Sequence, residues 1–385
     1  MKITFISNYL NHHQLYFCNE MYKKLGNDFV FIATNTMSNE RRKLGYEDMN
    51  DKYDFVVKSY ENKKLAYELS VNSDIVIIGS APQKYIRERL KKGKITIRYS
   101  ERIFKSNKKF IRCLPSLIKF KLYERNNTYL LCASAYSASD FNKLGLYKNK
   151  CYKWGYFPEV KEYSDIENRI KTKDDNSILW AARFIEWKHP EVVVQIAKKL
   201  KEDNYNFNIK MIGIGPLENK IKEMIKDNNL EDYIELLGSM SPNKVRKYME
   251  KSKIFLFTSD KNEGWGAVLN ESMNSACAVI ANDKIGSAPF LIENNKNGLI
   301  YEDGNIDDLY KKVKTLLDNN ELSTKLGLEA YKSMIDVWNP KTAADRIIEL
   351  SKFLLENKKF EKYTEGPCSY ICSNAKLKGD SIWNF

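Results

Sequence analysis

The sequence predicts an α/β protein made of two successive domains, each built on a doubly wound, Rossmann-like parallel sheet. Short apolar runs rich in β-branched residues alternate along the chain with segments of helical periodicity, which is the pattern of βαβ units. The 385 residues suffice for two or three domains. A polar, aperiodic stretch at residues 158–177 interrupts the alternation, so we expect a linker there.

We expect the first domain at residues 1–157 and the second at residues 178–340. Candidate strands of the first domain occupy residues 3–7, 29–33, 75–78, 95–99 and 129–133. Candidate strands of the second domain occupy residues 178–181, 207–212, 234–237, 254–258, 278–281 and 298–301. A long helix follows near residues 341–356, and we expect residues 341–385 to pack back on the first domain.

Charge is distributed unevenly along the chain. The net charge is +13, but residues 1–157 carry +15 and residues 158–385 carry −2. The densest part, residues 84–125, holds 15 Lys and Arg against three Glu. Such a segment attracts a polyanion, either nucleic acid or an anionic membrane surface. Apolar residues interleaved with the cations at residues 104–120 favour a segment that lies on a membrane.

The remaining composition predicts a cytoplasmic protein. The seven cysteines are odd in number and scattered, which argues against a disulfide framework. The chain turns polar at Asn8 before a signal-peptide core could form, and its apolar runs fall short of the roughly 18–20 residues that span a bilayer. We therefore expect reduced thiols and, at most, peripheral attachment to the inner face of the plasma membrane.

The strongest chemical signal is a pair of glutamates around a glycine-containing turn. The strand expected at residues 254–258 leads into Glu263, Gly264 and Gly266, and a helix carrying Glu271 follows. Glycines let the backbone approach a ligand, and the amides that open a helix favour an anion. We expect Glu263 at the strand's carboxyl end and Glu271 two turns into the helix, facing the same crevice. Carboxylates suit sugar hydroxyls, from which they accept hydrogen bonds.

A pair of cations follows the strand expected at residues 178–181. Arg183 and Lys188 are five residues apart and precede His189, Pro190 and a helix. Together the two cations could hold a diphosphate and stabilise its charge as it leaves. For His189 itself we expect a structural role at the helix start.

A third element is the turn Gly213-Ile214-Gly215-Pro216 after the next strand. Its proline breaks the GxGxxG pattern, and no such fingerprint follows the first strand of the chain. The sequence therefore argues against a nicotinamide dehydrogenase.

These residues together resemble the GT-B glycosyltransferases, specifically the large retaining family 4. The resemblance rests on Glu263 and Glu271, separated by seven residues that include Gly264 and Gly266. Further positions that match in order and spacing are Arg183, Lys188, Gly213, Gly215, Pro216, Leu217, Gly238, Ser259, Gly298 and Leu299. Any one of them would be a weak signal, but the set is specific.

The resemblance implies the GT-B fold, in which two Rossmann-like domains face each other across a cleft and the second binds a nucleotide-diphosphate sugar. It implies catalytic roles for Glu263 at the transferred sugar and for Arg183 and Lys188 at the diphosphate. It implies that Glu271 holds the ribose and that backbone N–H groups of Gly264, Trp265, Gly266 and Ala267 contact the transferred sugar with Glu263. The base would lie near Gly213, Gly215, Gly238, Ser239 and Met240. The resemblance further implies retention of configuration, no metal, and no cofactor beyond the UDP- or GDP-linked donor substrate.

Residues of the first domain are candidates for the acceptor side of the cleft. His12 and His13 follow the first strand, where a titratable ring could hydrogen-bond the sugar or the acceptor, or could cap the next helix. Asn11 lies beside them. Glu101 and Arg102 follow a later strand and are candidates for acceptor contacts.

These observations predict a hexosyltransferase that acts on a lipid-linked or oligosaccharide acceptor in cell-surface polysaccharide or glycolipid assembly. One alternative is a GT-B phosphorylase or synthase acting on soluble sugars. A second alternative, a basic nucleic-acid-binding protein, would explain the charge but not the glutamates. We therefore expect no nucleic-acid partner, and we interpret residues 84–125 as facing an anionic membrane surface.

Overall fold

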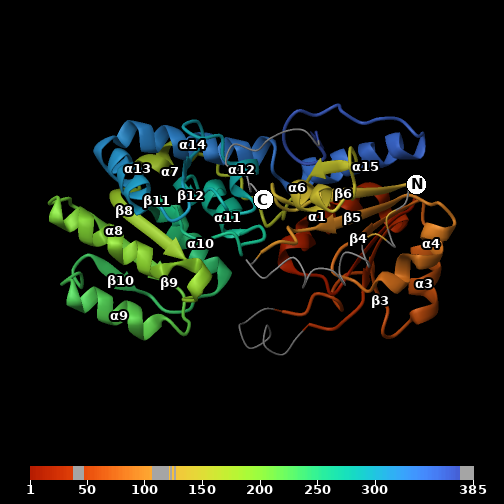
Figure 1. The fold of residues 1–385 in the computed structure, drawn as a ribbon, viewed down its shortest axis with the longest axis horizontal. Helices are drawn as coiled ribbons and strands as arrows, with labels where there is room; N and C mark the ends of the chain where they lie inside the picture. Colours follow the sequence, from red (N-terminus) through yellow and green to blue (C-terminus); the bar gives the residue numbers. More distant parts are fainter. Residues whose placement is uncertain (38–46, 106–120, 122–123, 125–126, 373–385) are drawn as a thin grey trace. The chain divides into compact units, whose positions relative to one another are not determined.

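The computed structural model describes residues 1–37, 47–105, 121, 124 and 127–372, and the chain forms two compact units (Figure 1). Unit 1 comprises Met1–Glu159 and Trp338–Phe385, and unit 2 comprises Val160–Val337. The chain therefore begins in unit 1, builds unit 2 and returns to unit 1.

The sheet of unit 1 is doubly wound, with the strand order β14-β7-β6-β5-β4-β1-β2-β3. β1 and β4 are fully buried, as strands covered on both faces must be, and Ile3 of β1 lies between Phe29 of β2 and Ile75 of β4. Neighbouring strands are parallel except β14 against β7. The strands are β1 Ile3–Ser7, β2 Phe29–Ala33, β3 Val56–Lys58, β4 Ile75–Ile78, β5 Thr96–Ser100, β6 Thr128–Cys132, β7 Cys151–Lys153 and β14 Tyr370–Ile371.

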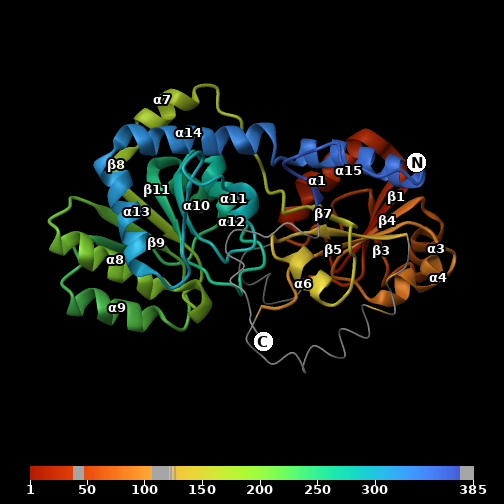
Figure 2. The same cartoon turned by 45° about the horizontal axis from the view of Figure 1, so that its top comes forward.

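Helices cover the sheet of unit 1, and the long helix near the end of the chain is one of them. That helix, α15, packs against α1, and Lys24 of α1 forms an ion pair of 2.7 Å with Asp345 of α15 (Figure 2). Beneath α1, the ring of Phe5 makes edge contacts with Phe17 and Phe31. The helices are α1 His12–Leu25, α3 Lys63–Asn72, α4 Arg87–Lys91, α6 Ser137–Lys143 and α15 Pro340–Leu355.

The sheet of unit 2 is also doubly wound, and its strands are all parallel in the order β10-β9-β8-β11-β12-β13. The strands are β8 Asp174–Ala181, β9 Asn208–Ile212, β10 Ile234–Leu236, β11 Ser252–Phe257, β12 Ala278–Asn282 and β13 Leu299–Tyr301. The helices are α7 Ile166–Lys171, α8 Pro190–Glu202, α9 Glu218–Asp227, α10 Pro242–Lys251, α11 Val268–Asn274, α12 Ala288–Leu291, α13 Ile306–Asp318 and α14 Asn320–Asp336.

Residues 158–177 are not a linker throughout, which corrects the expectation from the sequence. They contain α7, whose N-cap Asp165 accepts a hydrogen bond of 3.0 Å from the amide of Asn168. They also contain the first residues of β8, which are polar but form hydrogen bonds to the neighbouring strand. For example, the side chain of Asn208 in β9 donates a hydrogen bond of 2.7 Å to Asp174. Polar composition therefore concealed a short helix and half a strand.

The described residues include no helix that is both long and apolar enough to cross a bilayer.

Candidate functional site

The winding direction of the unit 2 sheet reverses between β8 and β11. These two strands are neighbours, but the chain leaves β8 towards β9 and leaves β11 towards β12, on the opposite side. Ligands of doubly wound sheets bind where the winding direction reverses in this way. We call this place the unit 2 switch point and define it by the loops at residues 182–189 and 258–267. The three predicted catalytic residues all lie in these loops.

Lys188 and Glu263 meet directly at the unit 2 switch point. The Lys188 ammonium is ion-paired with Glu263 Oε2, although the two residues are 75 positions apart. Their side chains are only 12% and 11% exposed, so this pair is shielded from solvent and interacts more strongly than an ion pair at the surface. The structure thus brings together a carboxylate and a cation that the sequence placed only on separate strand ends.

One indole ring lies beside both predicted cations. Lys188 Nζ is 4.5 Å from the ring centre of Trp187, and the guanidinium carbon of Arg183 is 5.9 Å from the same centre. Arg183 is exposed, whereas Lys188 is largely buried. Cation–π attraction to a shared ring favours keeping two like charges near each other. Sequence reasoning missed Trp187, and its position between the two cations in the chain was the available signal.

Hydrogen bonds through Thr258, directly after β11, join β8 to the loop at residues 182–189. The side chain of Trp180 donates to the hydroxyl of Thr258 at 2.8 Å, and that hydroxyl donates to the carbonyl of Lys188 at 2.6 Å. The three groups are largely shielded from solvent, where hydrogen bonds order the chain strongly. The backbone of Lys188 is therefore held at the carboxyl end of β11.

Gly266 is required by the turn that follows Glu263. Its φ of +85° is in the region that side chains rarely adopt, and a Cβ there would lie 2.4 Å from Cζ of Phe257. The Glu263 carbonyl accepts a hydrogen bond of 3.3 Å from the amide of Gly286, which ties the turn to the next loop. Gly266 is therefore needed for close packing against Phe257, and its predicted approach to a ligand stays a prediction.

Glu271 lies in the first turn of α11, not two turns into the helix as expected, because α11 begins only at Val268. A carboxylate at this end of a helix interacts favourably with the helix dipole. Arg246 donates to the backbone carbonyl of Glu271 at 3.1 Å and to the side chain of Asn274 at 2.8 Å. These contacts with Arg246 hold α11 in place, so that Glu271 stays beside the turn containing Gly266.

The side chain of Trp265 faces the core, which leaves only its backbone for the predicted donor contact. It is completely buried, and its indole nitrogen donates to Asn270 at 2.8 Å. Only backbone groups of Trp265 can face a ligand. Gly264 and Ala267, also predicted, are buried beside it in the same turn.

The glycines after β9 serve the backbone of unit 2 itself. A Cβ on Gly213 would lie 1.8 Å from the Ala182 carbonyl oxygen, and one on Gly215 would lie 2.4 Å from that of Phe184. This close packing continues the β8–β9 pairing beyond the strand ends. Gly238 has a φ of +68° and accepts a hydrogen bond of 2.8 Å from the amide of Gly213. The segment predicted to lie near the base is thus rigidly built, with Ser239 exposed and Met240 half-buried at its rim.

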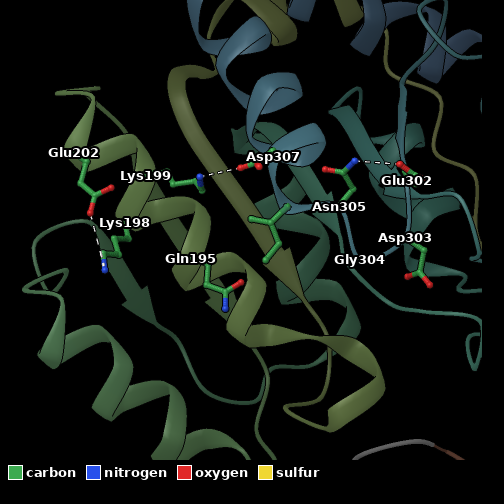
Figure 3. Close-up of a pocket in the computed structure, with 10 residues that line it drawn as sticks. Gln195, Lys198, Lys199, Glu202, Glu302, Asp303, Gly304, Asn305 and Asp307 are labelled. Carbon is green, nitrogen blue, oxygen red and sulfur yellow. Dashed lines mark hydrogen bonds and ion pairs between the residues drawn. The ribbon is translucent and has the colours of Figure 1, made fainter.

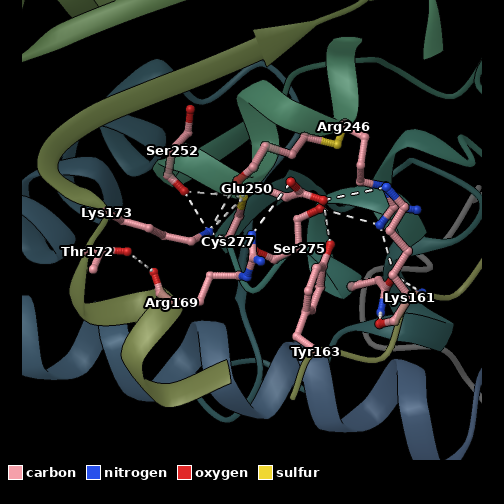
Figure 4. A network of polar contacts seen from close by, with 12 residues as sticks. Lys161, Tyr163, Arg169, Thr172, Lys173, Arg246, Glu250, Ser252, Ser275 and Cys277 are labelled. Atoms are coloured by element: carbon pink, nitrogen blue, oxygen red, sulfur yellow. Dashed lines mark hydrogen bonds and ion pairs between the residues drawn. The ribbon is translucent and has the colours of Figure 1, made fainter. Parts of the chain in front are cut away.

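A buried lysine supports unit 2 behind the switch point (Figure 4). The Lys173 ammonium donates to the carbonyls of Ser252, Ser275 and Ala276 at 2.7–3.0 Å and to that of Met249 at 3.2 Å. Burial lowers the pKa of Lys173, and the carbonyls satisfy its three protons. Lys173 therefore joins the ends of α10 and α11, the helix that carries Glu271.

A hollow of about 850 Å³ lies away from the predicted residues, between α8 and the start of α13 (Figure 3). Two lysines and four carboxylates are among its lining residues, and both lysines form ion pairs there, Lys199 with Asp307 at 2.9 Å and Lys198 with Glu202 at 4.0 Å. Exposed ion pairs of this kind favour no particular ligand, so we assign the hollow no function.

The histidines predicted for the acceptor side lie at the corresponding position of unit 1, where β1 and β4 are neighbours and the winding direction reverses. The rings of His12 and His13 are 3.7 Å apart, and His13 stacks on Tyr156 at 5.4 Å. Neither histidine caps α1. Asn11 does so, because its side-chain oxygen accepts a hydrogen bond of 3.0 Å from the amide of His13.

Glu101 and Arg102 follow β5 in unit 1, and the structure separates their roles. Glu101 is hydrogen-bonded to the hydroxyl of Tyr156 and ion-paired with Lys105. Arg102 lies 3.6 Å from the buried carboxylate of Asp140, whose pKa is raised by burial although the Arg102 charge opposes this. Glu101 therefore joins the ring cluster of His13 and Tyr156, whereas Arg102 is held within the fold.

The basic segment at residues 84–125 lies only partly in the described residues, because residues 106–120, 122–123 and 125–126 fall outside them. In its described part, Arg89 is buried and donates to the carbonyls of Ile95 and Asp74. Arg98 is also buried and donates to Tyr147 at 3.1 Å. These two cations support the fold and cannot face a membrane, which corrects part of the interpretation of this segment.

The two Rossmann-like parallel-sheet units define the GT-B class of fold, which confirms the predicted architecture. Among solved structures, the chain resembles Anabaena HepE in complex with UDP, with a TM-score of 0.70 and 15% identity over 91% of this chain and all of that one. It also resembles TarM, with a TM-score of 0.67 and 15% identity over 92% of this chain and 98% of that one.

Residues 163–333, almost all of unit 2, match the family described as Glycosyl transferases group 1. The chain is 30% identical to an uncharacterized glycosyltransferase of Methanocaldococcus jannaschii over 54% of this chain and 55% of that protein. It is 30% identical to the poly(ribitol-phosphate) alpha-N-acetylglucosaminyltransferase of Staphylococcus aureus over 44% of this chain and 34% of that protein. The matched segments thus span about half or less of these relatives.

Proposed function

We propose that the chain is a retaining glycosyltransferase of family 4 that moves a hexose-type sugar from a nucleotide-diphosphate donor to a glycan or lipid-linked acceptor. The observation that carries the proposal is the arrangement at the unit 2 switch point. There, Arg183, the Lys188–Glu263 pair and Glu271 lie at the carboxyl edge of a sheet in a GT-B domain. A second observation in its favour is the family match over the same residues.

In the proposed reaction, the bond between the anomeric carbon and the diphosphate oxygen breaks while the acceptor hydroxyl bonds to that carbon on the same face. The acceptor proton passes to the leaving diphosphate. Arg183 and Lys188 bind the diphosphate and stabilise the charge that grows on it. Glu263 orients the hydroxyls of the sugar, and Glu271 binds the ribose. The chain's own residues thus supply positioning and charge stabilisation, and the proposed reaction assigns no step to a metal.

The relatives suggest the classes of donor and acceptor. HepE was solved with UDP and with UDP-glucose, and the pneumococcal transferase GtfA with UDP and GlcNAc. A Campylobacter jejuni relative, 31% identical over 41% of this chain, is named for transfer to a diphospho-undecaprenol-linked sugar. A relative in Escherichia coli is named for colanic acid biosynthesis. We therefore propose a UDP-linked donor before a GDP-linked one, and an acceptor in cell-surface polysaccharide assembly.

We also propose that exposed cations of residues 84–125 contact an anionic membrane surface and so bring the chain to a lipid-linked acceptor. Binding to vesicles that contain anionic phospholipid should weaken as salt rises, because exposed charges are screened. Equal binding to neutral vesicles would contradict this proposal.

The experiment that tests the function screens the full chain against UDP, GDP, ADP and CMP sugars by thermal unfolding and then assays transfer. We expect one donor to raise the unfolding temperature and to be consumed when a lipid-linked or oligosaccharide acceptor is added. NMR of the product should show the donor's anomeric configuration. Phosphorolysis, or transfer to free soluble sugars only, would favour a phosphorylase or synthase instead. No stabilisation by any nucleotide sugar would contradict the proposal.

A further inference from the structure

His189 occupies an unusual backbone conformation beside the catalytic cation. Its φ of +50° and ψ of +53° are left-handed, a region that glycine tolerates better than histidine. The residue follows Lys188 directly and is the N-cap of α8, with Pro190 in the first helical position. A side chain in a position that suits glycine needs compensating contacts.

The imidazole of His189 provides such contacts, because it lies between two carboxylates. Nδ1 is 3.0 Å from Glu191 Oε1 on α8, and Nε2 is 3.3 Å from Asp260 Oδ2 on the loop after β11. Both ring nitrogens can donate at once only when the imidazole is protonated. The hydrogen bonds to Asp260 and then to Glu191 raise the pKa of His189 to about 10, although partial burial opposes the shift.

Asp260 connects this imidazolium to Glu263. Its backbone amide donates to the carbonyl of Trp187 at 3.1 Å, and its own carbonyl accepts a hydrogen bond of 3.0 Å from the amide of Glu263. Its carboxylate also accepts a hydrogen bond of 2.7 Å from the amide of Asn262. The loop carrying Glu263 is therefore attached to the loop carrying Lys188 at Asp260, next to the ion pair that the two residues form.

We propose that protonated His189 is a positioning residue that clamps residues 260–263 to residues 187–189 and so fixes Glu263 against Lys188. This proposal rests on the proposed glycosyl transfer, in which Lys188 and Glu263 act on the donor. We call His189, Glu191 and Asp260 the imidazolium clamp. The charged groups near the ring include these two carboxylates and Lys188, the preceding residue in the chain. Lys220 is also near, and its charge helps to lower the pKa of Glu191.

The substitution His189→Gly tests the clamp, because glycine suits the left-handed backbone and removes only the ring. Asn204→Gly is the matched control, since Asn204 has a φ of +59° just beyond the other end of α8. Hydrogen exchange of residues 258–263 in the full chain is the readout that needs no substrate. We expect faster exchange in His189→Gly and in Asp260→Asn, and wild-type exchange in Asn204→Gly.

Kinetics then connect the clamp to transfer. We expect kcat of His189→Gly to fall at least about tenfold while the donor KM changes much less, because misplacement of catalytic groups affects the transition state most. Wild-type exchange at residues 258–263, or a wild-type kcat, in His189→Gly would overturn the proposal. If the wild-type chain transferred no sugar, the proposed function would fail, while the exchange measurement would still decide whether the clamp exists.

Discussion

The two switch points of this protein have the same sheet topology and different chemistry. In unit 2, the loops after β8 and β11 bring together cations, carboxylates and glycines that permit close backbone packing. In unit 1, the corresponding region after β1 holds stacked rings, and Glu101 is bonded to one of them. The strand order therefore decides where a ligand can bind, while the loop residues decide which ligand. Charged loops suit a diphosphate, and ring faces suit a sugar.

The largest effect should come from removing the shielded cation of unit 2. We expect Lys188→Ala to lower kcat about 100- to 1000-fold, because it removes charge stabilisation and leaves Glu263 without its partner in a shielded site. Lys198→Ala is the control, since Lys198 is an exposed lysine on the neighbouring helix α8. Steady-state kinetics should show the loss of kcat in Lys188→Ala and not in Lys198→Ala. Equal turnover in the two would show that the cation has no catalytic role.

A second variant tests whether the packing of the turn in unit 2 matters as much as its charges. We expect Gly266→Ala to destabilise the chain by roughly 1–3 kcal/mol, because the added Cβ meets Phe257 and φ is positive. Gly304→Ala shares the positive φ but has no atom within 4 Å of the added Cβ. Urea unfolding should therefore show a smaller loss for Gly304→Ala. Equal losses would mean that the Phe257 contact is unimportant.

The imidazolium clamp also predicts a pH dependence of stability. Because the pKa of His189 rises from 6.5 to about 10 on folding, its contribution is complete below about pH 6.5 and is lost as the pH rises towards 10. The unfolding temperature of the wild type should therefore fall more than that of His189→Gly between pH 6.5 and 10. Parallel curves for the two proteins would contradict the assignment.

A smaller effect is expected in unit 1. Tyr156→Phe keeps the ring that stacks on His13 but removes the hydroxyl bonded to Glu101. If this cluster contacts the acceptor, the acceptor KM should rise several-fold, because the loss of one hydrogen bond weakens binding by about that factor. The donor KM should not change. A change in the donor KM alone would mean that this cluster contacts the donor, which would contradict the assignment of the acceptor to unit 1.

Metal removal should have the smallest effect. Because Arg183 and Lys188 are proposed to stabilise the charge of the diphosphate, transfer rates before and after EDTA treatment should agree. Activity lost with EDTA and restored by a divalent cation would show that these two residues are not sufficient.

The fold was predictable because it depends on local patterns. The apolar, β-branched runs of β1, β4 and β11 are buried strands at nearly the expected bounds. The short strands β3 and β7 and the long helix α14 were missed, since they have few residues or weak periodicity. Residues 158–177 were wrongly predicted to be a linker because their polar side chains have structural places. Asp165 is the N-cap of α7, and Asp174 lies at the exposed end of β8.

The candidate site could be predicted from residue types and spacing, but its contacts could not. Glu263, Arg183 and Lys188 were predicted from their spacing within short segments, and their catalytic roles stay predictions. The pairing of His189 with Asp260 spans 71 positions and depends on β8 and β11 being neighbours, which no local pattern reveals. The hydrogen bond between the Trp265 indole and Asn270 was also not predictable, because the sequence does not show which side of a turn faces the core.

Hydrogen exchange of the full chain, with and without the nucleoside diphosphate identified by the donor screen, shows whether the donor binds at the unit 2 switch point. We expect the nucleotide to slow exchange in the loops at residues 182–189 and 258–267, with little change in residues 8–13 of unit 1. Protection confined to residues 8–13, or the absence of protection in both units, would contradict donor binding at the unit 2 switch point.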